Sequence, residues 1–232
     1  MTHVRHRLAI AAALTAAAVL MTGCQSDSDS EGDSGGGGSA ALSLDGLVET
    51  ADGVPEDGAD TCPLPYDIAA AAKAAGVDGE AGPGPVREDA ETPVATGEGG
   101  KRAKGKEPLA ENPGALVSCT FHIGPDDVRV HTVATEERNA ITILAPVVSE
   151  LTRVAIDDVV AFTNEAATTE ETGKVVTADT GNVATVRLEL DGEGDAALLV
   201  GTVDGESGEP DAALDRKQLA ALTEALAGQV QQ

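Results

Sequence analysis

Residues 115–134 read ALVSCTFHIGPDDVRVHTVA, and this stretch decides the fold. Apolar residues alternate with polar ones on both sides of Gly124-Pro125-Asp126, which is typical of two antiparallel strands joined by a tight turn. We therefore predict a β-hairpin with strands over 115–123 and 127–134.

The register of this hairpin determines which side chains share a face. A four-residue turn places Ile123 opposite Val128 and Phe121 opposite Val130, so that the apolar rows of both strands lie on the same side. We expect four polar residues on the other side: Thr120, His122, Arg129 and His131.

The segments around the hairpin complete an α+β pattern. We predict helices over 66–75, 136–151, 156–167 and 216–228, and further strands over 174–178, 182–190 and 196–203. In the strand over 182–190, Thr185 and Arg187 alternate with apolar residues and are expected on a solvated face. In the last helix, Asp215 and Gln218 have capping-box spacing, and the expected buried stripe comprises Leu219, Leu222, Leu226 and Val230. In the third helix, the spacing of Ile156, Val159, Val160 and Thr163 indicates the buried stripe, and Pro146 either kinks the second helix or begins a new one. The expected fold is a mainly antiparallel sheet of about five strands, with helices on one face and a C-terminal helix.

The first 24 residues have the layout of a secretory signal. Arg5 and Arg7 precede an apolar run over 8–21, which is followed by Met21-Thr22-Gly23-Cys24. This ending resembles a bacterial lipobox, which implies cleavage between Gly23 and Cys24 and attachment of lipid to the Cys24 sulfur. An ordinary signal peptide or a membrane-spanning helix is the alternative, although the run is shorter than the roughly 20 residues that a span needs.

The cysteines and the sequence after the anchor define the expected domains. With Cys24 lipidated, Cys62 and Cys119 remain to form a disulfide outside the cytoplasm, or else stay as two free buried thiols. We predict a signal peptide over 1–23, an acidic flexible tether over 24–60, and one domain over 61–232.

Residues 78–113 are predicted to be a disordered insertion within this domain, because they are poor in apolar residues and rich in glycine, proline and charge. They contain the basic cluster Lys101-Arg102-Ala103-Lys104-Gly105-Lys106. This cluster is either solvated, a docking loop for an acidic partner, or a segment that folds back on the acidic body.

Composition excludes some partners. Two of the 15 Lys and Arg residues and none of the 40 acidic residues precede Cys24, so residues 24–232 carry a formal charge of −27. This charge repels nucleic acid, and three aromatic residues are too few for base-stacking platforms.

Candidate chemistry is sparse. His122 and His131 share a face in the expected register and could hold a metal, but the sequence after Cys24 has no third histidine, so we expect an exposed pair on the hairpin. The acidic turn over 191–195 resembles the start of a calcium loop. Such a loop needs glycine at its sixth position and an acid at its twelfth, where this sequence has Ala196 and Thr202. No Gly-x-Ser-x-Gly or phosphate-loop motif is present, so we expect no catalytic residue, metal or cofactor.

The order of these features resembles the small actinobacterial envelope lipoproteins of the domain-of-unknown-function 3558 type. The matching residues are Cys62 before the first helix and Cys119-Thr120-Phe121 in a strand, with Phe121 where tryptophan is common. The insertion over 78–113 departs from that pattern. The resemblance implies an α+β sandwich with a disulfide, and it implies no reaction.

The expected protein is a lipoprotein anchored to the cell membrane through Cys24, on the extracytoplasmic face. We expect it to be a non-enzymatic module that binds a small ligand or an envelope protein. One alternative is an envelope hydrolase or transferase with a site around His122 and His131, and another is a passive structural spacer.

Overall fold

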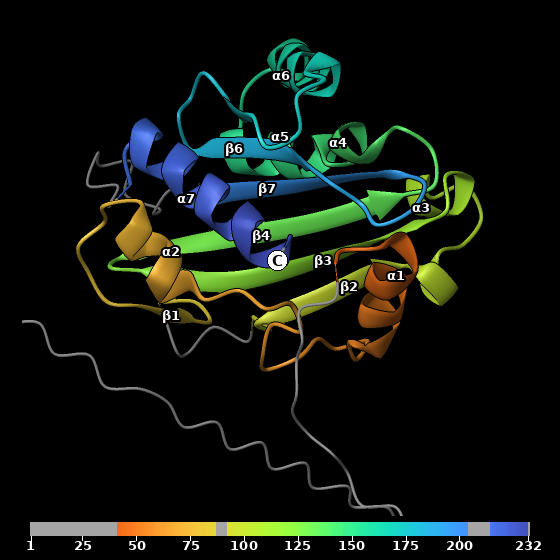
Figure 1. The fold of residues 1–232 in the computed structure, drawn as a ribbon, viewed down its shortest axis with the longest axis horizontal. Coiled ribbons are helices and arrows are strands. Elements are labelled where there is room, and N and C mark those ends of the chain that lie inside the picture. The colour runs from red at the N-terminus through yellow and green to blue at the C-terminus, as the bar shows by residue number, and fades with distance from the viewer. Residues whose placement is uncertain (1–40, 87–91, 204–213, 232) are drawn as a thin grey trace, which may run out of the picture. The chain divides into compact units, whose positions relative to one another are not determined.

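The computed structural model describes residues 41–86, 92–203 and 214–231. Within the chain, Gly37–Gln232 forms a compact unit by itself. The predicted signal peptide, Gly23 and Cys24 lie outside the described residues. The described residues form a seven-stranded antiparallel sheet with helices against both faces (Figure 1).

The sheet has the strand order β1-β3-β4-β7-β6-β5, and β2 also pairs with β3. All pairs are antiparallel. The strands are β1 (Ala81–Pro83), β2 (Ala95–Gly99), β3 (Gly114–Ile123), β4 (Asp126–Thr135), β5 (Val175–Thr177), β6 (Val183–Leu188) and β7 (Asp195–Val203). The α+β class is confirmed, and the long central strands are those that the sequence predicts.

The predicted hairpin is β3 and β4, but its register differs by two residues. Ile123 pairs with Asp126, and Phe121 pairs with Val128. The connection is a two-residue turn, because Gly124 takes a φ of 57° that glycine permits and Pro125 holds the second position. A shift of two residues preserves the faces, so the predicted apolar side is still the buried one.

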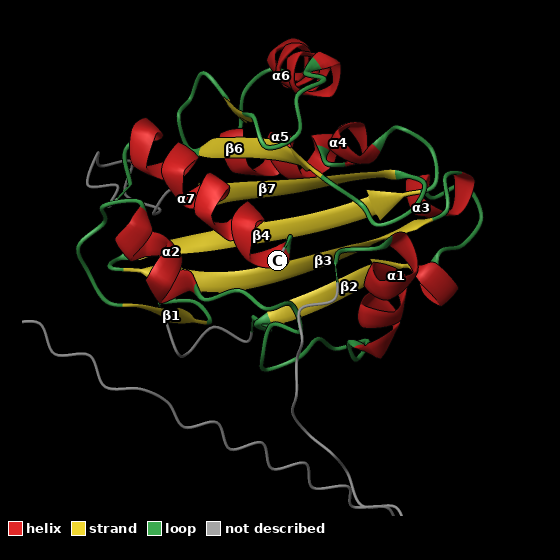
Figure 2. Ribbon diagram, in the orientation of Figure 1, coloured by secondary structure: helices red, strands yellow, loops and turns green. Residues whose placement is uncertain are grey.

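Helices cover both faces of the sheet, where we predicted one (Figure 2). One face packs against α1 (Leu44–Gly53), α2 (Ile68–Ala74) and α7 (Arg216–Val230). The other packs against α3 (Pro108–Glu111), α4 (Ala140–Ile143), α5 (Ala145–Thr152) and α6 (Ile156–Thr168). Consequently both faces of β6 are buried, and the solvated face predicted for Thr185 and Arg187 is wrong.

The prediction of a flexible tether over 24–60 is wrong at residues 44–53, which form helix α1. The Ser43 side chain accepts a hydrogen bond from the Gly46 N–H at 3.1 Å and caps the helix, and Leu47 and Ala51 are buried. Gly97 of β2 lies directly beneath it, where a Cβ would approach the Ala51 carbonyl oxygen to 2.5 Å. The helix therefore packs against the sheet through a position that only glycine fits.

The prediction of a disordered insertion over 78–113 is also wrong for its described parts, residues 78–86 and 92–113. These residues contribute β1, β2, a 3-10 turn over Gly100–Arg102 and α3. Arg102 donates hydrogen bonds to the carbonyl oxygens of Gly97, Asp52 and Val54, and Lys101 pairs with the Asp52 carboxylate at 3.4 Å. Lys101 and Arg102 of the basic cluster thus fold back on the body and meet the carbonyl end of α1.

The bounds of the other predicted helices agree closely with the structure. The predicted helix over 136–151 is divided into α4 and α5, with Pro146 in the first turn of α5. Helix α7 begins with the predicted capping box of Asp215 and Gln218. Its buried stripe is the predicted one, comprising Leu219, Leu222, Leu226 and Val230.

Candidate functional site

The two predicted disulfide cysteines are joined. Cys62 and Cys119 form a disulfide with a Cα–Cα distance of 5.5 Å. It connects the segment before α2 to the middle of β3, where Cys119 is buried. Beside it, the Tyr66 ring packs edge-on against Phe121, and the Tyr66 hydroxyl lies 2.5 Å from Thr132 Oγ1.

The histidine pair does not form a site. His122 and His131 share a face as predicted, but His122 pairs with Asp127 whereas His131 pairs with Ser118. Four strand positions separate the pairs, which is about 14 Å at roughly 3.4 Å per residue. In the described part of the chain no group of three His, Cys, Asp or Glu side chains could hold a metal ion.

His131 is buried, where we expected a solvated pair. Its Nδ1 lies 2.7 Å from Ser118 Oγ, and its Nε2 has no hydrogen-bond partner among the described residues. A serine–histidine contact is part of a nucleophilic triad, but a triad also needs an acid on the other ring nitrogen. The enzyme alternative therefore gains no support from this contact.

His131 makes the stability of the protein depend on pH. Burial, and to a smaller extent the nearby Arg129 charge, lowers the pKa of His131 to about 4, and Glu150 offsets part of this shift. Between pH 6.5 and pH 4 the unfolded chain takes up a proton that the folded chain refuses, so stability falls as the pH falls. We expect a loss of about 3 kcal/mol from this group.

The variant His131→Asn tests this expectation, because an amide can still meet Ser118 and does not titrate. Urea unfolding at pH 6.5 and pH 4 should show a decrease about 3 kcal/mol larger in the wild type than in the variant. Parallel decreases in the two proteins would contradict this assignment.

A buried ion pair lies where the sequence suggested a solvated strand and turn. The Arg187 guanidinium donates to Asp195 Oδ1 and to the Ala167 carbonyl oxygen, and Asp195 Oδ2 accepts from the Ala140 N–H at 2.9 Å. The two side chains are 9% and 5% exposed. The pair joins β6 and β7 to the start of α4 and the end of α6, so its role is to hold the layers together.

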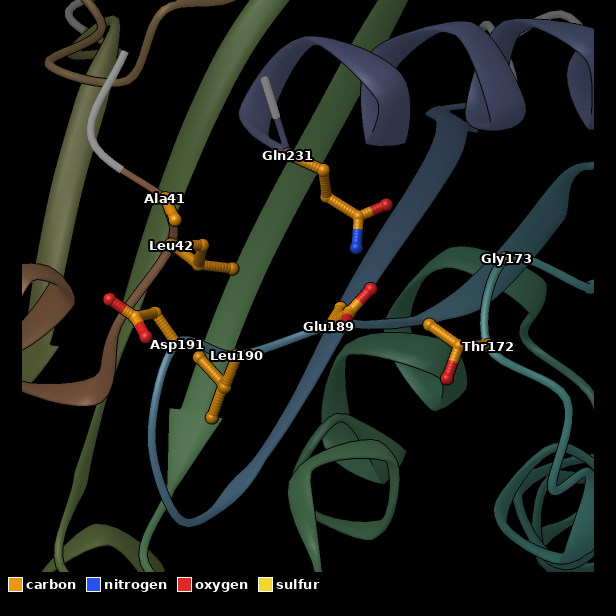
Figure 3. A pocket seen from close by; sticks show the side chains of 8 residues that line it. All are labelled: Ala41, Leu42, Thr172, Gly173, Glu189, Leu190, Asp191 and Gln231. Atoms are coloured by element: carbon orange, nitrogen blue, oxygen red, sulfur yellow. The ribbon is translucent and has the colours of Figure 1, made fainter.

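An open hollow lies beside the first described residues (Figure 3). Its volume is about 600 Å³, and it lies between the segment before α1, the β6–β7 connection and the end of α7. The Asp191 N–H donates to the Leu42 carbonyl oxygen at 2.8 Å, and Gln231 extends from α7 toward Glu189. The hollow is wide and open, which gives a small ligand little to enclose it.

A more enclosed cleft lies between α5, α6 and the β5–β6 turn. Its volume is about 340 Å³. Its apolar lining comprises Val148, Val154, Val159, Ala161, Phe162 and Ala178. Its polar lining comprises Thr152, Asp158, Glu165, Thr177, Asp179 and Thr180. An apolar floor with a few polar groups at the rim is the usual composition of a small-molecule site, so this cleft is the candidate.

The cleft was not predicted because the buried face of α6 is turned relative to the predicted one. The buried residues of α6 are Val159, Phe162, Thr163 and Ala166, whereas Ile156 and Val160 are 65% and 47% exposed. Both the predicted and the observed stripes have the i, i+3, i+4, i+7 spacing of a helix face. The large Phe162 ring was the signal that could have decided between them.

No family model, curated protein or solved structure matches this chain. Among the helices that the structure describes, none has the length and apolar character required to span a membrane. The case for a function therefore depends on the cleft, the disulfide and the N-terminal motif.

Proposed function

We propose that this protein is a lipoprotein anchored through Cys24 to the extracytoplasmic face of the cell membrane, and that its body binds a small ligand in the α5–α6 cleft without chemical turnover. The observation that carries the binding role is the cleft itself. It is concave, floored by buried side chains such as Val159 and Phe162, and of about 340 Å³. This volume lies at the lower end of the range of roughly 300–1,000 Å³ that is usual for ligand pockets.

Two features support export and anchoring. Met21-Thr22-Gly23-Cys24 ends an apolar segment in the manner of a lipobox. The Cys62–Cys119 disulfide is of a kind that persists outside the reducing cytoplasm. Two acyl chains on one cysteine give stable attachment, which a single chain does not.

A non-enzymatic role fits the lining of the cleft. Of the described residues that line it, none is histidine, cysteine, serine or lysine. Such a lining has no nucleophile paired with a histidine base, the arrangement that acyl-transfer chemistry uses. Its hydroxyls and carboxylates suit recognition of a ligand by hydrogen bonds and charge.

The anchor is tested by Cys24→Ser. We expect this variant to incorporate no radiolabelled palmitate and to retain its first 23 residues, because the acyl acceptor and the cleavage motif are both lost. The control Cys62→Ser should incorporate label as the wild type does. Label that survives Cys24→Ser would refute lipidation at this position.

The binding role is tested by filling the cleft. Native mass spectrometry of the protein released gently from membranes should reveal a bound small molecule, and Ala161→Trp should abolish it, because Ala161 is an exposed residue that lines the cleft. Ala69→Trp, at an exposed position on α2, is the matched control. Equal retention of the molecule by both variants would place the ligand elsewhere.

A further inference from the structure

We infer that the ligand of the α5–α6 cleft is a small amphipathic amine, with one apolar end and at least one protonated amino group. This inference rests on the proposed binding role of the cleft and specifies its ligand. It follows from the size of the cleft, the distribution of charge around it and the apolar character of its floor.

Size favours a small molecule over a protein segment. One turn of an α-helix about 10 Å across and 5.4 Å long occupies roughly 400 Å³. The cleft offers about 340 Å³, and it is walled by α6 on one side and by α5 and the β5–β6 turn on the other. This volume suits a ring or a short alkyl chain better than a whole turn of helix.

Charge favours a cation. Of the described residues that line the cleft, three are acidic and none is basic. Asp158 and Glu165 lie two turns apart on α6, and Asp179 lies on the β5–β6 turn, so carboxylates stand on both walls. None of the three is paired with a basic side chain in the described part of the chain. A protonated amine between the walls would supply the missing counter-charge.

The nearest basic residues leave these carboxylates available. Arg216 donates its Nη2 hydrogen bond to the Thr177 carbonyl oxygen at 2.9 Å. Arg153 lies between the lining residues Thr152 and Val154, but its own side chain is exposed and is not part of the lining. Neither arginine forms an ion pair with Asp158, Glu165 or Asp179 in the described part of the chain.

The apolar lining of the cleft accounts for the apolar end of the proposed ligand. The apolar lining that solvent reaches includes the exposed Ala161 and the half-buried Val154, beside the buried Val148, Val159 and Phe162. Water over such a surface is displaced favourably by an apolar group, at about 25 cal/mol per Å² of area removed from water. A simple metal cation or a fully hydrated polyamine would leave Ala161 and Val154 in contact with water.

Three probes with one skeleton test the inference: 4-phenylbutylamine, 4-phenylbutan-1-ol and 4-phenylbutyrate. They are titrated into residues 24–232 carrying Cys24→Ser, which include the whole compact unit Gly37–Gln232. Amide resonances of Ala161, Ala178 and Thr180 report occupancy of the cleft. We expect the amine to bind roughly tenfold more tightly than the alcohol, and the carboxylate to be the weakest.

The variant Asp158→Asn/Glu165→Gln removes two charges with little change of shape. It should weaken the amine roughly tenfold and leave the alcohol within about twofold. The control Glu98→Gln/Glu224→Gln neutralises two exposed carboxylates that do not line the cleft, and it should change neither affinity. Added salt should weaken the amine alone, because screening acts on charge.

The outcomes separate this inference from the binding role. Equal binding of all three probes in the cleft would overturn the amine as the ligand class and leave the cleft a binding site. Probes that shift no cleft resonance would overturn both. An amine preference that persists unchanged in Asp158→Asn/Glu165→Gln would also overturn the inference, because the attraction would then arise elsewhere.

Discussion

Replacing Cys62 and Cys119 together with alanine lowers the free energy of unfolding by an expected 4 kcal/mol or so. The disulfide closes a loop of 57 residues, and its loss releases the unfolded chain from that constraint. Alanine is the suitable replacement because Cys119 is 1% exposed, and a serine hydroxyl there would be buried.

Urea unfolding of the wild type, with and without reductant, provides the comparison. The reduced wild type should approach the stability of the double variant, and the single variant Cys62→Ala should do the same. A loss below about 1 kcal/mol would mean that the unfolded chain is already held together by other contacts. Without reductant, alkylating reagents should modify neither cysteine.

Replacing Asp195 with alanine costs an expected 3–5 kcal/mol, in the range measured when one partner of a buried ion pair is removed. The substitution leaves the Arg187 guanidinium buried without its counter-charge and the Ala140 N–H without its acceptor. The variant Arg187→Met/Asp195→Ala should be more stable than the sum of the single losses predicts, since no charge is then left unpaired.

The pair of Arg129 and Glu150 is the matched control. Their side chains are 32% and 65% exposed, so Glu150→Ala should cost no more than about 1 kcal/mol. Thermal or urea unfolding of these three variants and of the single variant Arg187→Met measures the difference. Similar losses for Asp195→Ala and Glu150→Ala would show that the buried pair does not stabilise the layers.

The sequence predicted the elements whose pattern is local. The alternation in residues 115–134 is sufficient to define a hairpin and its buried face, because side chains on a strand alternate whatever the partner does. The register was wrong by two residues, since it depends on the backbone angles of Gly124 and Pro125. The cysteine pair was predictable because only two cysteines remained after Cys24.

The elements that were missed depend on contacts between distant segments. Helix α1 looked too interrupted by glycine and proline to fold, yet Gly53 only ends it, and its stability comes from packing on β2 and β3. Residues 95–99 are poor in apolar side chains and pair through the backbone, which leaves little trace in composition. Arg187 is on a buried face because α4–α6 cover it, which alternation within β6 cannot reveal.

The candidate site was missed for a related reason. The cleft is formed by α5, α6 and the β5–β6 turn, and no short motif spans these segments. Its acids are inconspicuous among 40 acidic residues. The rotation of α6 decides whether Asp158 and Glu165 line the cleft, and two faces of this helix have the same apolar spacing.

The short strands at the margins of the sheet have a consequence for how crowded copies of this protein behave. Strand β3 is ten residues long, and its outer side is occupied by β2 of five residues and β1 of three, while the opposite margin is β5 of three. A long bare strand would recruit neighbouring chains into intermolecular sheets. The glycine-containing strands β1 and β2 cover β3, and Arg102 links β2 to α1 through the carbonyl oxygens of Gly97 and Asp52. This cover protects the chain against aggregation at high local concentration.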